Sequence, residues 1–277
     1  MLYIFNSPRL RERRAGLDLL NDITKDKGKC LIIHYSCESF ITNHGLTPRI
    51  TSICIKSLST GQTISFSIHL QAQFTGLNIN ALSNGEYDQL ELAMLTEFSE
   101  YVKKHSSFKW VHWNMRDSNY GFEAINNRIR ILKGINFDID DDRKYDFPRI
   151  LALIYTMQYE KNKPKGRLLN LAVRNKIGTE NALTGSEEAN AFDEKQYLKL
   201  HMSTLKKVDI IEGIITRANN SDLTVMTGNI HIYGLTIPGI FKLVKDTPWL
   251  LLIATAVGYI LNLIIEPIIK NYFHIGS

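Results

Sequence analysis

Three strand-like segments precede the first long amphipathic helix in residues 30–132, and this order limits the fold more than any other feature of the sequence. Residues 30–36 form a mostly apolar run with the length of a buried strand. Residues 49–58 and 63–72 alternate apolar and polar side chains on either side of a Gly-Gln turn. This alternation around a short glycine turn is typical of a β-hairpin, so the region is predicted to begin with three strands.

A helix, a strand and a second helix are predicted after the hairpin. The first helix follows Asn84, and its apolar face consists of Leu90, Met94, Leu95, Phe98 and Val102. Residues 108–113 read as a strand, and the apolar spacing from about Tyr120 onward predicts the second helix. The order β-β-β-α-β-α predicts an α/β fold with a mixed sheet and flanking helices. It fits poorly with a doubly wound dinucleotide-binding domain, and the sequence has no glycine-rich phosphate-binding motif.

The predicted domain limits follow from these patterns. Residues 1–29 are expected to form a short strand and a helix, with Ser7 as the N-cap and Pro8 in the first turn. Residues 30–225 are expected to form the α/β domain, whose second half is helical. A hydrophobic content of 44% with 22% charged residues suits a packed core. Three cysteines without a CxxC motif, and no secretory signal, place this domain in the cytoplasm.

The C-terminal tail contains an apolar run, residues 249–265, that carries no charge. A helix of that length spans about 26 Å, close to the thickness of the hydrocarbon core. Residues 248–270 are therefore predicted to form a transmembrane helix, with Trp249 and Tyr272 as interfacial aromatic residues. The alternative is a buried C-terminal core helix.

This tail determines the predicted location of the protein. More positive charge lies on the N-terminal side of the run, which predicts a tail-anchored, single-pass protein of the inner (cytoplasmic) membrane with its large domain in the cytoplasm. Asn262 and Glu266 seek polar partners in a bilayer, so together with Trp249 they are the expected membrane and oligomer contacts. Residues 226–247 fit either a juxtamembrane linker or an interfacial helix.

Polar residues follow two of the predicted strands. Ser36 and Glu38 come at the end of the first strand, and Asn114, Arg116 and Asp117 follow the strand at 108–113. In open α/β sheets, ligands bind outside the carboxyl ends of the strands. These five residues are therefore the predicted ligand-binding site, although Arg116 and Asp117 fit an ordinary surface ion pair as well.

Two histidines and one acidic run have plainer interpretations. His34 lies on a buried strand and His201 on an amphipathic helix, so both are interpreted as packed residues rather than catalytic bases. The acidic run 138–142 lacks the glycine and the distal glutamate of a calcium-binding loop. It is interpreted as a solvated turn.

The segments IIHYSCESF and WVHWNMRDSNYGFEAI, separated by a hairpin and a helix, resemble the RNase H-like fold. They are similar in particular to the proofreading-type 3′–5′ exonucleases, which hold two divalent ions with four acidic ligands. The resemblance implies an Asp-x-Glu motif on the first strand, where this chain has Ser36 and Glu38. It also implies an Asn followed four residues later by Asp. Asn114 matches, but Ser118 takes the place of that aspartate and Asp117 comes one position early.

The third motif of that family places His or Tyr on a later helix, with an aspartate after a fixed gap. His201 matches, but Lys206 stands five residues later and Asp209 is out of step. With so few acidic residues, no metal ligand is assigned, and Glu38 and Asp117 remain the candidates. The resemblance implies a degenerate relative of these exonucleases that covers roughly residues 30–210.

Three functions are compatible with these features. The first is a membrane-anchored binding or sensor module, of the architecture that bacterial antiviral (anti-phage) effectors often have, with a nucleic acid or nucleotide as ligand. The second is an active nuclease tethered to the membrane, which would use Glu38, Asp117 and Asp209 with Mg²⁺ or Mn²⁺. The third is a structural protein that forms homo-oligomers through its tail. Substitutions in the motifs favour the first.

Overall fold

The computed structural model describes residues 7–39, 47–116 and 119–274. Its centre is a five-stranded sheet in the order β3-β2-β1-β4-β5. The strands are β1 (Cys30–Cys37), β2 (Ile50–Ser57), β3 (Thr63–Ser67), β4 (Lys109–His112) and β5 (Lys144–Asp146). β2 is antiparallel to β1 and to β3, whereas β4 is parallel to β1 and to β5. The prediction of an α/β fold with a mixed sheet is therefore confirmed.

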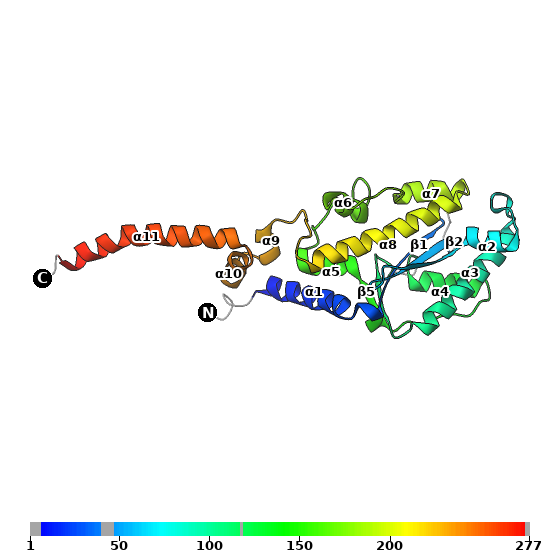
Figure 1. Ribbon diagram of the computed structural model, residues 1–277, viewed down its shortest axis with the longest axis horizontal. Helices are drawn as coiled ribbons and strands as arrows, with labels where there is room; N and C mark the ends of the chain where they lie inside the picture. Colours follow the sequence, from blue (N-terminus) through cyan, green and yellow to red (C-terminus); the bar gives the residue numbers. More distant parts are fainter. Residues whose placement is uncertain (1–6, 40–46, 117–118, 275–277) are drawn as a thin grey trace.

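Helices cover both faces of the sheet (Figure 1). Alternate residues of β1 point to opposite sides, as the two-residue period of a strand requires. Leu31 and Ile33 pack with α3 (Asn84–Lys104) and α4 (Phe122–Ile131). Cys30 and Ile32 pack in a second core with α1 (Pro8–Lys25), α5 (Phe147–Tyr155), α6 (Arg167–Arg174) and α8 (Tyr197–Asn219). β1 thus lies between two hydrophobic cores, which explains its nearly continuous apolar run.

Local sequence signals fix the ends of several helices. The Ser7 side chain accepts a hydrogen bond from the Leu10 amide at the start of α1. Ser83 and Glu86 form a reciprocal capping box at the start of α3. Four further helices are α7 (Gly185–Asp193), α9 (Asn229–Tyr233), α10 (Ile237–Asp246) and α11 (Pro248–His274). The α11 helix extends away from the α/β body (Figure 1).

Two elements differ from the sequence-based expectation. The strand predicted for residues 63–72 ends at Ser67, and the chain continues as α2 (Ile68–Thr75), which ends at Gly76 with a φ of 70°. Buried Ile68 and Ala72 lie one helical turn apart, so the same apolar residues satisfy a helix. The short strand β5 was not predicted, because three residues give no periodicity. The strand predicted near the N-terminus falls in residues 1–6, outside the described residues.

The predicted transmembrane helix over residues 248–270 is wrong. Within the described residues, no helix is both long and apolar enough to cross a membrane. The helix α11 contains Asn262, Glu266 and Pro267. An amide and a carboxylate are costly in hydrocarbon, and the uncharged run ahead of Glu266 is at the short end of what a span requires.

Candidate functional site

Ser36 and Glu38 lie where β1 ends, and both are engaged by the neighbouring strand. The Thr51 hydroxyl donates to the Ser36 carbonyl over 3.0 Å, and its oxygen lies 2.6 Å from the Ser36 hydroxyl. The Glu38 amide donates to the Arg49 carbonyl over 2.8 Å, and the Arg49 amide donates to the Glu38 carboxylate over 3.3 Å. Ser36 is buried, so its hydroxyl serves the pairing of β1 with β2 rather than a ligand.

An ion pair between partly buried Glu188 of α7 and buried Lys207 of α8 lies beside the end of β1. The Lys207 ammonium is 2.6 Å from a Glu188 carboxylate oxygen, and the Ser203 hydroxyl donates to the same oxygen over 2.8 Å. Burial lowers the pKa of His34 well below its usual value, and the nearby charge of Lys207 lowers it further. His34 is therefore neutral. These interactions place a cation next to the strand end where the resemblance implied a carboxylate.

The loop between β4 and α4 is fixed to β1 by aromatic residues. The Tyr120 hydroxyl donates to the Tyr35 carbonyl over 3.0 Å, and the two rings stack at 4.5 Å. The Tyr35 hydroxyl accepts a hydrogen bond of 2.9 Å from the Gly121 amide. Tyr120 also lies 3.4 Å from a ring nitrogen of His34, so this histidine belongs to the packed interior.

Asn114 and Arg116 both contact Asp146, the last residue of β5. The Asn114 amide donates to one oxygen of Asp146 over 3.2 Å, and the Arg116 guanidinium lies 2.8 Å from the other. Burial raises the pKa of Asp146, while the charge of Arg116 and the Asn114 amide oppose that rise. The Arg116 side chain is 57% exposed. The carboxyl ends of β4 and β5 thus present one accessible cation that pairs with a largely buried carboxylate.

His112 also stabilises the loop that follows β4. Its Nδ1 accepts a hydrogen bond of 3.1 Å from the Met115 amide. Burial lowers the pKa of His112 to about 3, and the charges of Arg116 and Lys144 add to the effect. The imidazole is therefore neutral near pH 7, and it supplies an acceptor to the loop rather than a charge to a ligand.

The proposed nuclease acids do not all meet. The Lys56 ammonium binds Asp209 at 2.6 Å, and Lys56 pairs across the sheet with Ile32. Glu38 lies six residues beyond Ile32. Along the strand direction it is therefore roughly 20 Å from the level of Lys56 and its partner Asp209. Asp117 is outside the described residues. In the part of the chain that the structure describes, no three His, Cys, Asp or Glu side chains are grouped so that they could hold a metal ion.

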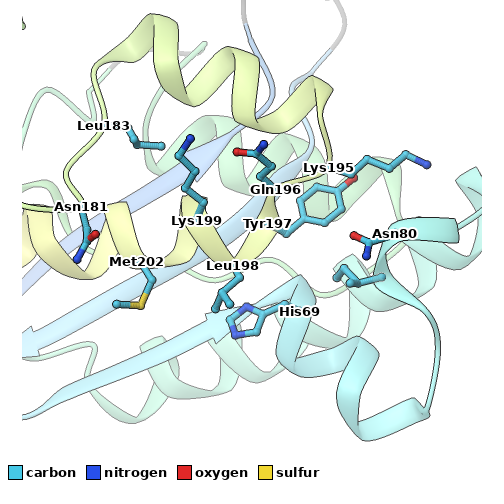
Figure 2. Close-up of a pocket in the computed structure, with 11 residues that line it drawn as sticks. His69, Asn80, Asn181, Leu183, Lys195, Gln196, Tyr197, Leu198, Lys199 and Met202 are labelled. Carbon is cyan, nitrogen blue, oxygen red and sulfur yellow. The ribbon is translucent and has the colours of Figure 1, made fainter.

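A hollow of about 710 Å³ lies next to this region, between α2 and the start of α8 (Figure 2). Tyr197 lines the hollow. Burial raises the pKa of Tyr197, the charge of Arg49 opposes the rise, and the charge of Glu38 adds to it. Tyr197 is thus close enough to Glu38 and Arg49 to feel their charges.

His69 and His201 connect the hollow to the sheet. Their ring centroids are 4.7 Å apart. His201 Nδ1 lies 2.7 Å from the Ser52 hydroxyl, and His69 Nδ1 lies 2.9 Å from the Ser67 hydroxyl. Burial lowers the pKa of His201 to about 4, and His69 contributes to that shift. Both histidines are thus positioned by strand serines.

Sequence reasoning missed three residues of this region. Asp146 was assigned only to the start of a helix, because the short strand that it ends gives no pattern. Lys207 and Glu188 were overlooked because counting from His201 leads to Lys206 and Asp209. The available signal was Lys207 itself, a lysine at a position that helical periodicity predicts to be buried.

Comparison with known proteins found no matching family model, no similar curated protein and no similar solved structure. The function is therefore inferred from the geometry of the site.

Proposed function

We propose that this protein binds single-stranded nucleic acid through a nuclease-like α/β domain that does not cleave it. Three features support this function. The sheet begins with three antiparallel strands and continues with two parallel ones, an arrangement that supports the relationship to the RNase H-like fold. An exposed arginine, Arg116, follows the end of β4. The acidic set of a two-metal nuclease is replaced in part by other residues.

The ion pair of Lys207 and Glu188 carries the proposal. Two-metal catalysis needs several carboxylates that together balance two divalent cations. Here a buried ammonium lies beside β1, 2.6 Å from a carboxylate that α7 contributes. Ser36, which replaces the first acidic residue of the family motif, is neutral and hydrogen-bonded to Thr51. A divalent cation at this position would be repelled by Lys207 and would lack that ligand.

Arg116 is the residue that this proposal assigns to nucleic acid. Its guanidinium is 57% exposed, and Asp146 fixes it at 2.8 Å. A planar guanidinium can pair with a phosphate or stack on a base, and both modes are common in the binding of single strands. The net charge of +5 favours association with a polyanion.

A metal-dependent nuclease is the second candidate. Glu38 and Glu188 both lie near Cys37, since each of their charges raises the pKa of that thiol, which burial already raises. Two carboxylates thus share the end of β1. If Asp117 joined them, a single divalent ion would have a partial ligand set.

One experiment separates the two candidates. The full chain is mixed with labelled single-stranded DNA and RNA, with Mg²⁺, Mn²⁺ or EDTA, and both anisotropy and strand length are measured. We expect binding without shortening of the strand under all three conditions. Affinity should fall about tenfold in Arg116→Ala, which corresponds to the loss of one charged contact.

Arg217→Ala is the matched control. Arg217 is also a partly exposed arginine that pairs with one carboxylate, Asp222 at 3.4 Å, but it lies at the far end of α8. Its replacement should leave affinity unchanged. Shortening of the strand that requires a metal ion and disappears in Glu38→Ala would establish the nuclease instead. Absence of binding by the folded wild-type chain would reject the proposal.

A further inference from the structure

The hollow beside α8 has the size and the concave shape of a small-molecule site. Its volume is about 710 Å³, within the usual range for ligand pockets. One wall comes from α2 and the 3-10 turn Ile79–Ala81, and the other from residues 181–183 ahead of α7, the segment that joins α7 to α8 and the first turns of α8. The lining residues are His69, Ile79, Asn80, Asn181, Leu183, Lys195, Gln196, Tyr197, Leu198, Lys199 and Met202.

The charge of this lining is entirely positive. Lys195 and Lys199 are exposed, and no carboxylate is among the lining residues. Figure 2 shows the two lysines on either side of Gln196, with their ammonium groups pointing away from each other. Glu187 lies near Lys199 and Glu194 accepts a hydrogen bond of 2.6 Å from Gln196, but neither carboxylate lines the hollow, so a ligand with an anionic group at the end of the hollow where α8 begins would complement the two lysines.

The start of α8 adds to the positive potential at the same end. The helix has 23 residues, no side chain caps its N-terminus, and its first turn contains no acidic residue. The first amides of a helix lack partners within the helix and carry a partial positive charge. The helix end alone defines no ligand, but here it coincides with two lysines on the rim of a hollow.

The opposite end of the hollow is apolar. Leu198 is 60% exposed and Met202 is 41% exposed, and they lie one helical turn apart on α8. Figure 2 shows the His69 ring close to Leu198. Large apolar side chains that stay exposed in a concave site are typical of surfaces that a ligand covers.

Three carboxamides stand between or beside these two ends, from Asn80, Asn181 and Gln196. A carboxamide both donates and accepts hydrogen bonds in one plane, and the edge of a nucleobase has the same pattern. Asn181 has a left-handed backbone with a φ of 67°, and Lys195 has one with a φ of 56°. Uncommon backbone conformations of this kind are often found at functional sites.

We propose that this hollow binds a nucleoside monophosphate. The phosphate would lie at the start of α8, on the side of the hollow that carries Lys195 and Lys199, and the base would lie against Leu198, Met202 and the His69 ring. A fatty acid would satisfy the cations and the apolar end but would leave the carboxamides unused. The site is separate from Arg116, so it does not depend on binding of nucleic acid at the strand ends.

Calorimetry on the full chain tests this site directly. The probes are AMP, GMP, CMP and UMP, with the four corresponding nucleosides, inorganic phosphate and dodecanoate as comparison ligands. We expect at least one monophosphate to bind, and its nucleoside and free phosphate to bind at least tenfold more weakly. The double variant Lys195→Gln/Lys199→Gln should weaken binding of the monophosphate at least tenfold, because it removes both charges and keeps the side-chain stems.

The matched control is Lys104→Gln/Lys133→Gln. Lys133 is an exposed lysine with a left-handed backbone like Lys195, and Lys104 is an exposed helical lysine like Lys199. Neither lines the hollow, so the control should bind as the wild type does. Leu198→Glu should abolish binding, since it places a carboxylate on the apolar wall. Circular dichroism establishes that each variant is folded.

Three outcomes would overturn the proposal. One is that no monophosphate binds the folded wild-type chain at millimolar concentration. Another is that the double lysine variant binds as tightly as the wild type. The third is that dodecanoate binds in the place of all four nucleotides. Because Arg116→Ala should leave binding of the monophosphate unchanged, failure of this site is distinguishable from failure of the nucleic-acid proposal.

Discussion

The Arg128 guanidinium lies 2.7 Å from a Glu91 carboxylate that is completely buried between α3 and the sheet. The other Glu91 oxygen accepts a hydrogen bond of 2.7 Å from the Ile50 amide, the first residue of β2. One carboxylate thus connects α3, α4 and β2. A buried charge that loses its partner is strongly destabilising, whereas removal of both charges costs much less.

The buried pair of Glu91 and Arg128 predicts a large coupling energy between these two residues. Arg128→Met should lower the free energy of unfolding by about 3–5 kcal/mol, because Glu91 would stay buried without a countercharge. The double variant Glu91→Gln/Arg128→Met should recover at least half of that loss, since the carbonyl of the introduced glutamine still accepts from the Ile50 amide. Urea denaturation of the four proteins of the double-mutant cycle measures the coupling. Additive losses would show that the pair is not coupled.

The left-handed backbone of Asn114, between β4 and α4, predicts how substitutions at this position change stability. Its φ is 58°, in the left-handed region that Gly and Asn adopt most readily. Asn114→Ala should therefore destabilise the fold by about 1 kcal/mol, whereas Asn114→Gly should change it by less than about 0.5 kcal/mol. Both variants keep the amide that donates to Asp146. Equal losses in thermal denaturation would show that the Asn side chain, not the backbone, stabilises this joint.

The strongest sequence patterns predicted their elements well, and the weaker ones failed for identifiable reasons. The apolar run of β1 and the apolar stripe of α3 each extend over enough residues to define a period. Residues 68–72 satisfied both the two-residue and the helical period, so only packing selects the helix. The second half of the domain was expected to be helical, but the sequence pattern did not show the break at Lys195, whose left-handed backbone separates α7 from α8.

The candidate site was predicted only in part. Asn114 and Arg116 were correctly expected to lie at a strand end, but their partner Asp146 lies 30 or more residues later in the sequence. The rotation of α8 about its axis determines that Lys207, rather than Asp209, points towards β1. That rotation follows from the packing of the whole helix on the sheet, and a motif counted from His201 does not include it.

The neutral state of His112 predicts how stability depends on pH. Burial first, then the charges of Arg116 and Lys144, lower the pKa of His112 from 6.5 to about 3. Between these values the unfolded chain binds a proton that the folded chain does not. Stability is therefore lost as the pH falls below 6.5, by at most about 1.4 kcal/mol per pH unit from this residue.

His112→Gln isolates this contribution. The glutamine carbonyl can still accept a hydrogen bond from the Met115 amide, but the side chain does not titrate. Between about pH 6.5 and pH 4.5, the variant should lose about 2–3 kcal/mol less stability than the wild type does. Urea denaturation at a series of pH values provides the comparison. Parallel curves for the two proteins would mean that the pKa of His112 is the same in the folded and unfolded states.

The last prediction concerns the residues that replace metal ligands. If Ser36 and Lys207 block a divalent ion at the end of β1, then Ser36→Asp/Lys207→Asp should create a site with Glu38 and Glu188 nearby. The carboxylates repel one another without a metal, so the variant should be less stable than the wild type in EDTA. Mn²⁺ at ten times its dissociation constant should then raise the melting temperature by about 4 °C, because the ion binds only the folded state.

The neutral variant Ser36→Asn/Lys207→Asn is the control and should not respond to Mn²⁺. A response of the wild type equal to that of the double-aspartate variant would show that Lys207 does not exclude a metal, and the nuclease candidate would then be preferred.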